Sequence, residues 1–147
     1  MPHPRTLSAL AALAAVALAP AASAAPTKAT GVKLMASLTG AAEAPTPGDA
    51  DGTGMFTGRV NVGQGQLCYT LTSAKLGTLT MAHVHAGKVG VAGPPVVTLK
   101  ADSPGETCMA VDKATAQKLV SAPGDYYVNI HTSDYPAGAI RGQLMKH

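Results

Sequence analysis

Short segments in which apolar and polar side chains alternate, each bounded by glycine or proline, dominate the sequence after residue 31 and restrict its fold most. In residues 32–39 every second side chain is apolar, at Val32, Leu34, Ala36 and Leu38. A repeat of two residues places these side chains on one face of a β-strand, and we expect that face to be buried. Similar segments predict further strands over residues 55–62, 67–72, 79–85, 96–100, 106–111, 126–132 and 139–145.

One segment has helical character. Residues 113–120 are mostly side chains that tolerate a helix, and Asp112 can cap the first turn. Because Pro123 and Gly124 follow closely, the helix is limited to about two turns. Many short strands with a single short helix predict an all-β fold, an antiparallel sandwich or barrel.

The beginning of the sequence has the pattern of a secretory signal peptide. Arg5 precedes an apolar run over residues 7–19, and Ala22, Ser23 and Ala24 form an A-x-A cleavage site. The apolar run is shorter than the roughly 20 residues that a membrane-spanning helix needs, and no second such run follows. We therefore expect cleavage near Ala24, a secreted or periplasmic destination, and no membrane span in the mature chain.

Cleavage after residue 24 of the 147 residues leaves 123 residues, which suits one domain. We expect a flexible lead-in over residues 25–31 and a single domain over residues 32–147. The remaining 10 basic and 8 acidic residues give a net charge of +2, and the basic residues are scattered. This distribution argues against binding to nucleic acid, which requires a basic patch.

Two cysteines, Cys68 and Cys108, lie in strand-like segments of a chain bound for an oxidising compartment. An even count in that setting predicts a disulfide between them, in segments that can face each other across a sandwich. Two buried free thiols are the alternative.

Several segments of the sequence resemble the CHRD domain, first described in chordin and common in short exported bacterial proteins. They are LTGAAEAP at residues 38–45, AHVHAG at 82–87, GPPVV at 93–97, YYVNIHT at 126–132 and YPAGAIRGQL at 135–144. The resemblance implies an antiparallel Greek-key β-sandwich similar to that of Cu/Zn superoxide dismutase. It implies no particular activity, because the family has no settled biochemical role.

The histidines are the best candidates for a binding site. His83 and His85 are two residues apart on a predicted strand, so both imidazoles leave the same face. His131 belongs to the polar side of the 126–132 strand and can supply a third nitrogen. Three imidazoles suit zinc or copper. The alternative is that these histidines hydrogen-bond to backbone groups and act as struts.

Three further residues are secondary candidates. Met81 shares the predicted strand face of His83 and His85, and its thioether suits copper, although methionine is also a common core filler. Arg141 can neutralise an anion near the histidines or form a surface or inter-strand salt bridge. Glu43 can fix its loop or provide a carboxylate ligand.

No catalytic constellation is apparent, since the sequence has no nucleophile elbow, phosphate-binding loop or paired catalytic carboxylates. A superoxide dismutase-like enzyme is disfavoured because the mature histidines, which include only His147 besides the three candidates, cannot fill a copper site and a zinc site. The sequence therefore predicts an exported, non-enzymatic binding module with a histidine-centred metal site. A structural or adhesive envelope domain without metal is the alternative, and the partner is a metal ion or an extracellular or envelope protein.

Overall fold

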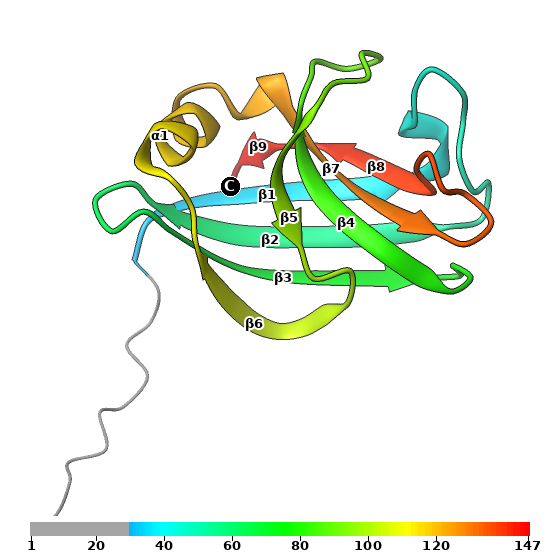
Figure 1. Ribbon diagram of the computed structural model, residues 1–147, viewed down its shortest axis with the longest axis horizontal. Helices are drawn as coiled ribbons and strands as arrows, with labels where there is room; N and C mark the ends of the chain where they lie inside the picture. Colours follow the sequence, from blue (N-terminus) through cyan, green and yellow to red (C-terminus); the bar gives the residue numbers. More distant parts are fainter. Residues whose placement is uncertain (1–29) are drawn as a thin grey trace, which may run out of the picture.

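The computed structural model describes residues 30–147 (Figure 1). The predicted signal peptide and most of the predicted lead-in lie outside the described residues. The strands of the described region are β1 (Val32–Thr39), β2 (Thr53–Asn61), β3 (Gln66–Ala74), β4 (Leu79–Ala86), β5 (Pro95–Leu99), β6 (Ser103–Ala110), β7 (Tyr126–Thr132), β8 (Ile140–Gln143) and β9 (Met145–Lys146). They are joined by one helix, α1 (Lys113–Ser121), and two single 3-10 turns, η1 (Gly40–Ala42) and η2 (Pro123–Asp125). The prediction of an all-β fold with one short helix is confirmed.

The strands belong to one antiparallel sheet in the order β5-β4-β7-β8-β1-β2-β3-β6, with β9 paired to β1. The sheet curls, so that β4 and β7 cross in front of β1, β2 and β3 (Figure 1). Its two edge strands, β5 and β6, do not pair, yet residues 96–98 and 109–112 line one groove between them. The strands thus form a curled, partly open sheet, and the Greek-key sandwich implied by the family resemblance stays a prediction.

The core fills the inside of the curled sheet, as the alternation in the strands predicts. Ten apolar side chains lie at the alternating positions of the predicted strands, and nine of them are buried, namely Leu34, Leu38, Leu67, Leu71, Val84, Val128, Ile130, Ile140 and Leu144. The tenth, Val32, is half-buried and packs against the same core. Phe56 and Tyr69 add a stacked aromatic pair with ring centroids 5.9 Å apart. At about 25 cal/mol per Å² of buried apolar area, this core is the main source of stability.

Helix α1 begins where the sequence indicates. The Asp112 side chain accepts a hydrogen bond of 2.9 Å from the Thr115 amide and so caps the first turn. Ala116 and Leu119 are buried against the core, so α1 covers one end of the curled sheet. Within residues 30–147, no helix is both long enough and apolar enough to cross a membrane.

The predicted disulfide between Cys68 and Cys108 is present. The two cysteines are direct register partners on the neighbouring strands β3 and β6, so the bond does not cross the core as we expected. It ties the edge strand β6 to the strand beside it.

The predicted strand over residues 139–145 is divided. Its first part, β8, pairs with β7 on one side and with β1 on the other, whereas β9 pairs with β1. Between the two parts, the Leu144 side chain is buried and its amide donates to the Tyr126 carbonyl at 2.9 Å. The chain thereby leaves β7 and keeps β1 as its neighbour within one apparently regular segment.

Candidate metal centre

The candidate site lies on the face of β4, β7 and β8 that points away from the core. The pairing of these strands places His83 beside Asn129 and Asn129 beside Arg141. In the next row, His85 lies beside Tyr127 and Tyr127 beside Gln143. Since side chains alternate between the two faces of a strand, these residues share one face and form a polar grid.

This outer face is nevertheless covered. His131, Asn129 and Arg141 are all buried, and the buried residues of β7 lie on both of its faces. The segment over residues 87–94 and the turn over residues 133–139 supply the backbone groups that the grid contacts. The site is therefore a polar interior outside the hydrophobic core, and its shape depends on two loops.

The three predicted histidines converge. One ligand nitrogen from each of His83, His85 and His131 lies within 4.8 Å of the other two. His83 Nδ1 is 3.2 Å from His131 Nε2, and the His83 ring makes edge contacts with both other rings, with centroids 5.3 Å and 5.1 Å away. The sequence-based expectation that a third histidine from residues 126–132 joins the H-x-H pair thus agrees with the geometry.

Two backbone carbonyls decide which nitrogens face the cluster. His85 Nδ1 is 2.7 Å from the Gly93 carbonyl oxygen, and His131 Nδ1 is 2.9 Å from that of Pro136. A carbonyl only accepts, so both Nδ1 atoms carry hydrogen and both Nε2 atoms of the neutral rings are left with a lone pair. His131 Nε2 accepts from His83 Nδ1, while His85 Nε2 is buried and has no hydrogen-bond partner in the described region.

The surroundings favour the neutral forms of His83 and His85. Burial lowers the pKa of His83, and the neighbouring His131 and His85 lower it further, while the Asn129 side chain opposes this shift. Burial also lowers the pKa of His85, against the opposing hydrogen bond to Gly93. Neutral imidazole is the form that binds metal ions, so the lowered pKa values extend metal-binding competence toward lower pH.

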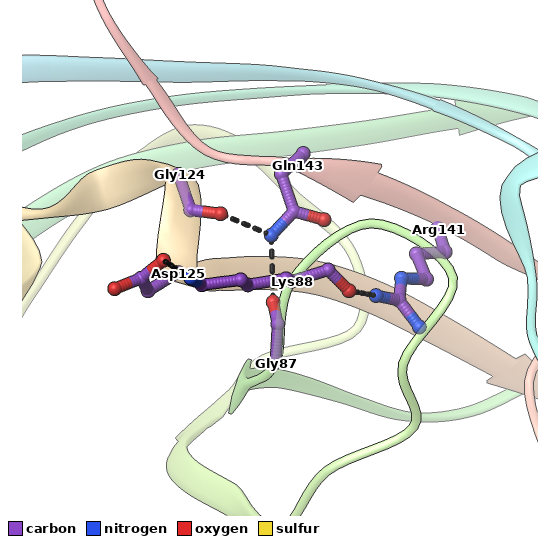
Figure 2. A network of polar contacts seen from close by, with 6 residues as sticks. All are labelled: Gly87, Lys88, Gly124, Asp125, Arg141 and Gln143. Carbon is purple, nitrogen blue, oxygen red and sulfur yellow. Dashed lines mark hydrogen bonds and ion pairs between the residues drawn. The ribbon is translucent and has the colours of Figure 1, made fainter.

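Arg141 is 1% exposed, so the surface salt bridge considered for it is wrong. Its guanidinium lies 3.3 Å from the centroid of the Tyr127 ring, and its Nη2 donates to the Lys88 carbonyl at 2.8 Å. Figure 2 shows the hydrogen bond from Arg141 to the Lys88 carbonyl. Beside it, Gln143 Nε2 donates to the carbonyls of Gly87 and Gly124. In the described region no carboxylate lies within ion-pair distance of Arg141, so it acts as a strut for the 87–94 segment.

Glu43 is also buried, and it packs against Gly138. Burial raises the pKa of its carboxyl to about 7, while Arg141, the Ala44 amide and the Asn129 side chain partly offset this rise. One carboxyl oxygen, Oε1, has no hydrogen-bond partner in the described region. Glu43 does not belong to the group of side chains that converge on a common point, so the structure places it near the grid but not among the candidate ligands.

Met81 is the register partner of His131, but its side chain is 48% exposed. It lies at the rim of the polar face. This position gives no particular support to a role in copper binding.

Sequence analysis missed three members of the grid, Asn129, Tyr127 and Gln143. The alternation of residues 126–132 already placed Tyr127 and Asn129 on the His131 face, which was the available signal. Gln143 gave no signal of its own, because its contacts are to loop carbonyls far away in the sequence.

The strand pairing, the buried polar face and its three histidines define an all-β domain with a candidate metal centre. A comparison with known proteins identifies its family. The CHRD domain family model matches residues 34–144, and the chain belongs to this family. The match includes all three histidines, Glu43, Arg141 and both cysteines. No curated protein and no solved structure matches the chain.

Proposed function

We propose that this CHRD protein is an exported module that binds one zinc or copper ion through His83, His85 and His131. The convergence of one nitrogen from each histidine within 4.8 Å is the observation that carries the proposal. The ligand atoms would be His83 Nδ1, His85 Nε2 and His131 Nε2, because the other nitrogens of His85 and His131 are bound to carbonyls.

The spacing of these atoms suits a metal ion after a small adjustment. Metal–nitrogen bonds of 2.0 to 2.1 Å in a tetrahedral site separate two ligand nitrogens by about 3.4 Å. The His83–His131 pair at 3.2 Å already has this separation. The longer separations, up to 4.8 Å, must shorten by up to about 1.4 Å, which small side-chain rotations, chiefly that of the half-buried His83, can supply.

Metal binding also requires a change at His83. In the metal-free protein, His83 Nδ1 donates its hydrogen to His131 Nε2. A metal ion needs lone pairs on both atoms, so the His83 proton must leave or move to Nε2. Three protein ligands leave one tetrahedral position for water or another small ligand.

The pattern of a signal peptide in residues 1–24 and the cross-link between Cys68 and Cys108 support an oxidising destination. We infer that the mature chain acts outside the cytoplasm, in the periplasm or the medium. We favour a binding role, because the titratable side chains that converge within residues 30–147 are the three histidines.

A second candidate function follows from the hydrogen bonds of the same histidines. His83 bonds to His131, and His85 and His131 each bond to a loop carbonyl. These contacts satisfy most of the buried imidazole nitrogens without a metal, as in a purely structural or adhesive envelope domain. The unpaired lone pair of His85 Nε2 favours the metal site.

Calorimetric titration of the mature protein, prepared without a polyhistidine tag and stripped with chelator, separates the two functions. The metal site predicts that the wild type binds one equivalent of Zn(II) or Cu(II). Each of His83→Ala, His85→Ala and His131→Ala should lower the affinity by at least about tenfold, the smallest loss that is typical when a group supporting a metal site is removed. His147→Ala is the matched control, because His147 is exposed and lies outside the cluster. Absence of stoichiometric binding of either ion, with the fold intact, would instead establish the histidines as struts.

A further inference from the structure

The tyrosine beside His85 has contacts that bear on how that histidine is presented. The rings of Tyr127 and His85 are stacked almost in parallel, with centroids 4.9 Å apart and an angle of 6°. Tyr127 is buried on β7, directly opposite His85 on β4. Its ring therefore limits rotation of the imidazole plane.

A second set of contacts links the Tyr127 hydroxyl to the acceptor that fixes the His85 tautomer. The Gly93 amide donates to Tyr127 Oη at 3.2 Å, and the Gly93 carbonyl accepts a hydrogen bond from His85 Nδ1 at 2.7 Å. Tyr127 therefore holds the amide of Gly93, and His85, which stacks on Tyr127, holds its carbonyl. Gly93 also approaches β4 so closely that an added Cβ would lie 1.6 Å from the Ala86 carbonyl oxygen.

The tyrosine itself is fixed from its other side. Strands β4 and β8 flank β7, so His85 and Arg141 reach Tyr127 from opposite sides. The Arg141 guanidinium covers the ring at 3.3 Å from its centroid, a cation–π contact, and is anchored to the Lys88 carbonyl (Figure 2). Arginine, tyrosine and histidine thus form a continuous stack across three strands.

We propose that Tyr127 is the positioning residue of His85. Its ring sets the imidazole plane, and its hydroxyl holds Gly93 so that the Gly93 carbonyl keeps hydrogen on Nδ1 and leaves the Nε2 lone pair facing the other two histidines. The role of Tyr127 in metal binding rests on the proposed function. Its effect on the His85 tautomer does not depend on a bound metal. Groups that fix the tautomer of a metal-binding histidine typically change affinity by about 10- to 100-fold.

Tyr127→Phe tests the hydroxyl, because it removes that group and keeps the stacked ring. In metal-free protein above the imidazole titration range, ¹⁵N NMR of the wild type should show only the Nδ1–H tautomer of His85. The variant should show a mixture of both tautomers, and its affinity for Zn(II), added as the chloride, should fall by about tenfold. Tyr127→Leu removes the ring as well and should weaken Zn(II) binding further; if that variant does not fold, Tyr127→Phe alone decides.

Tyr69→Phe is the matched control. Tyr69 is equally buried, and its hydroxyl also accepts from a backbone amide, that of Lys100 at 2.8 Å, but it belongs to β3. It should leave both the His85 tautomer and the Zn(II) affinity unchanged. A wild-type tautomer and affinity in Tyr127→Phe would overturn the proposal, and so would an equal loss of affinity in both variants. Failure of the wild type to bind Zn(II) or Cu(II) would overturn the proposed function instead, and the tautomer comparison would still decide the role of Tyr127.

Discussion

At the scale of single residues, the unusual feature is a pair of buried charged side chains beside the histidines. Arg141 lies on the polar grid and Glu43 lies near it, yet no salt bridge joins them within the described region. Arg141 contacts the Tyr127 ring and donates to the Lys88 carbonyl, while its Nη1 has no hydrogen-bond partner in the described region. Glu43 is left in surroundings that favour its neutral, protonated form, as the rise of its pKa to about 7 indicates.

Glu43→Gln should therefore stabilise the metal-free protein at alkaline pH. The folded-state pKa of about 7 is above the ordinary glutamate pKa of 4.5, so the folded chain binds more protons than the unfolded chain between these values. The protonated Glu43 carboxyl therefore stabilises the wild type at low pH, and this stabilisation is lost as the pH rises through about 7. Glutamine does not ionise, so the variant does not lose stability in this range. We expect a gain of about 1 to 2 kcal/mol at pH 8, after allowance for solvent screening, and almost none at pH 4.

Denaturant unfolding at several pH values measures this effect, with Glu106→Gln as the control because Glu106 is exposed. A Glu43→Gln protein that is less stable than the wild type at pH 8 would contradict it. That result would mean that attraction to Arg141 outweighs burial and keeps the carboxylate charged.

At the scale of elements, the segment between β4 and β5 is the part that completes the site. The sheet face holds one end through Arg141 and Gln143 at residues 87–88 (Figure 2). It holds the other end through His85 and Tyr127 at Gly93. Lys88 adds an exposed ion pair of 3.8 Å to Asp125, which contributes little. The histidine site and this segment therefore depend on the same contacts.

Gly93→Ala should disrupt the segment, because the added Cβ would meet the Ala86 carbonyl oxygen at 1.6 Å and backbone would have to move. We expect a loss of about 2 to 3 kcal/mol in the free energy of unfolding, together with weaker Zn(II) binding. Gly105→Ala is the control, because no atom lies within 4 Å of its added Cβ, and it should cost less than about 0.5 kcal/mol. Equal costs in denaturant unfolding would show that the close approach at Gly93 is not tightly constrained.

The elements also show what sequence can and cannot predict. Alternation and glycine or proline boundaries located most of the strands, and β7 begins and ends at the predicted residues. The strand predicted over residues 106–111 begins earlier, because β6 (Ser103–Ala110) includes Pro104 and Gly105. Alternation likewise placed His83 and His85 on one strand face and His131 on the polar side of another. The burial of Arg141 and Glu43 could not be predicted, because it arises from loops that fold over the outer face. The division of residues 139–145 into β8 and β9 was missed for a similar reason, since pairing partners, not local pattern, decide it.

At the scale of the whole molecule, the curled sheet has two unpaired edges, β5 and β6. Unpaired edges offer free backbone groups to other chains and are points of local opening. Only the β6 edge is covalently attached to its neighbour, through Cys68 and Cys108. The bond therefore restrains one of the two unpaired edges.

Replacement of Cys68 and Cys108 by alanine should destabilise the protein by about 2 to 5 kcal/mol and speed amide exchange in β6 before other strands. Denaturant unfolding and hydrogen exchange measure these effects, with exchange in β7 as the internal control. Uniform acceleration in all strands would contradict a local role. Alkylation of two free thiols in the native, unreduced protein would show that the bond does not form.

The most direct test of the histidine centre is X-ray absorption spectroscopy at the metal edge of the mature protein carrying one equivalent of Zn(II). Convergence of His83, His85 and His131 on one ion predicts three imidazole nitrogens at about 2.0 to 2.1 Å, with a fourth light ligand. His131→Ala should reduce the imidazole count to two, and His147→Ala should leave it at three. A zinc shell dominated by oxygen, or an imidazole count that His131→Ala does not change, would contradict a three-histidine metal centre.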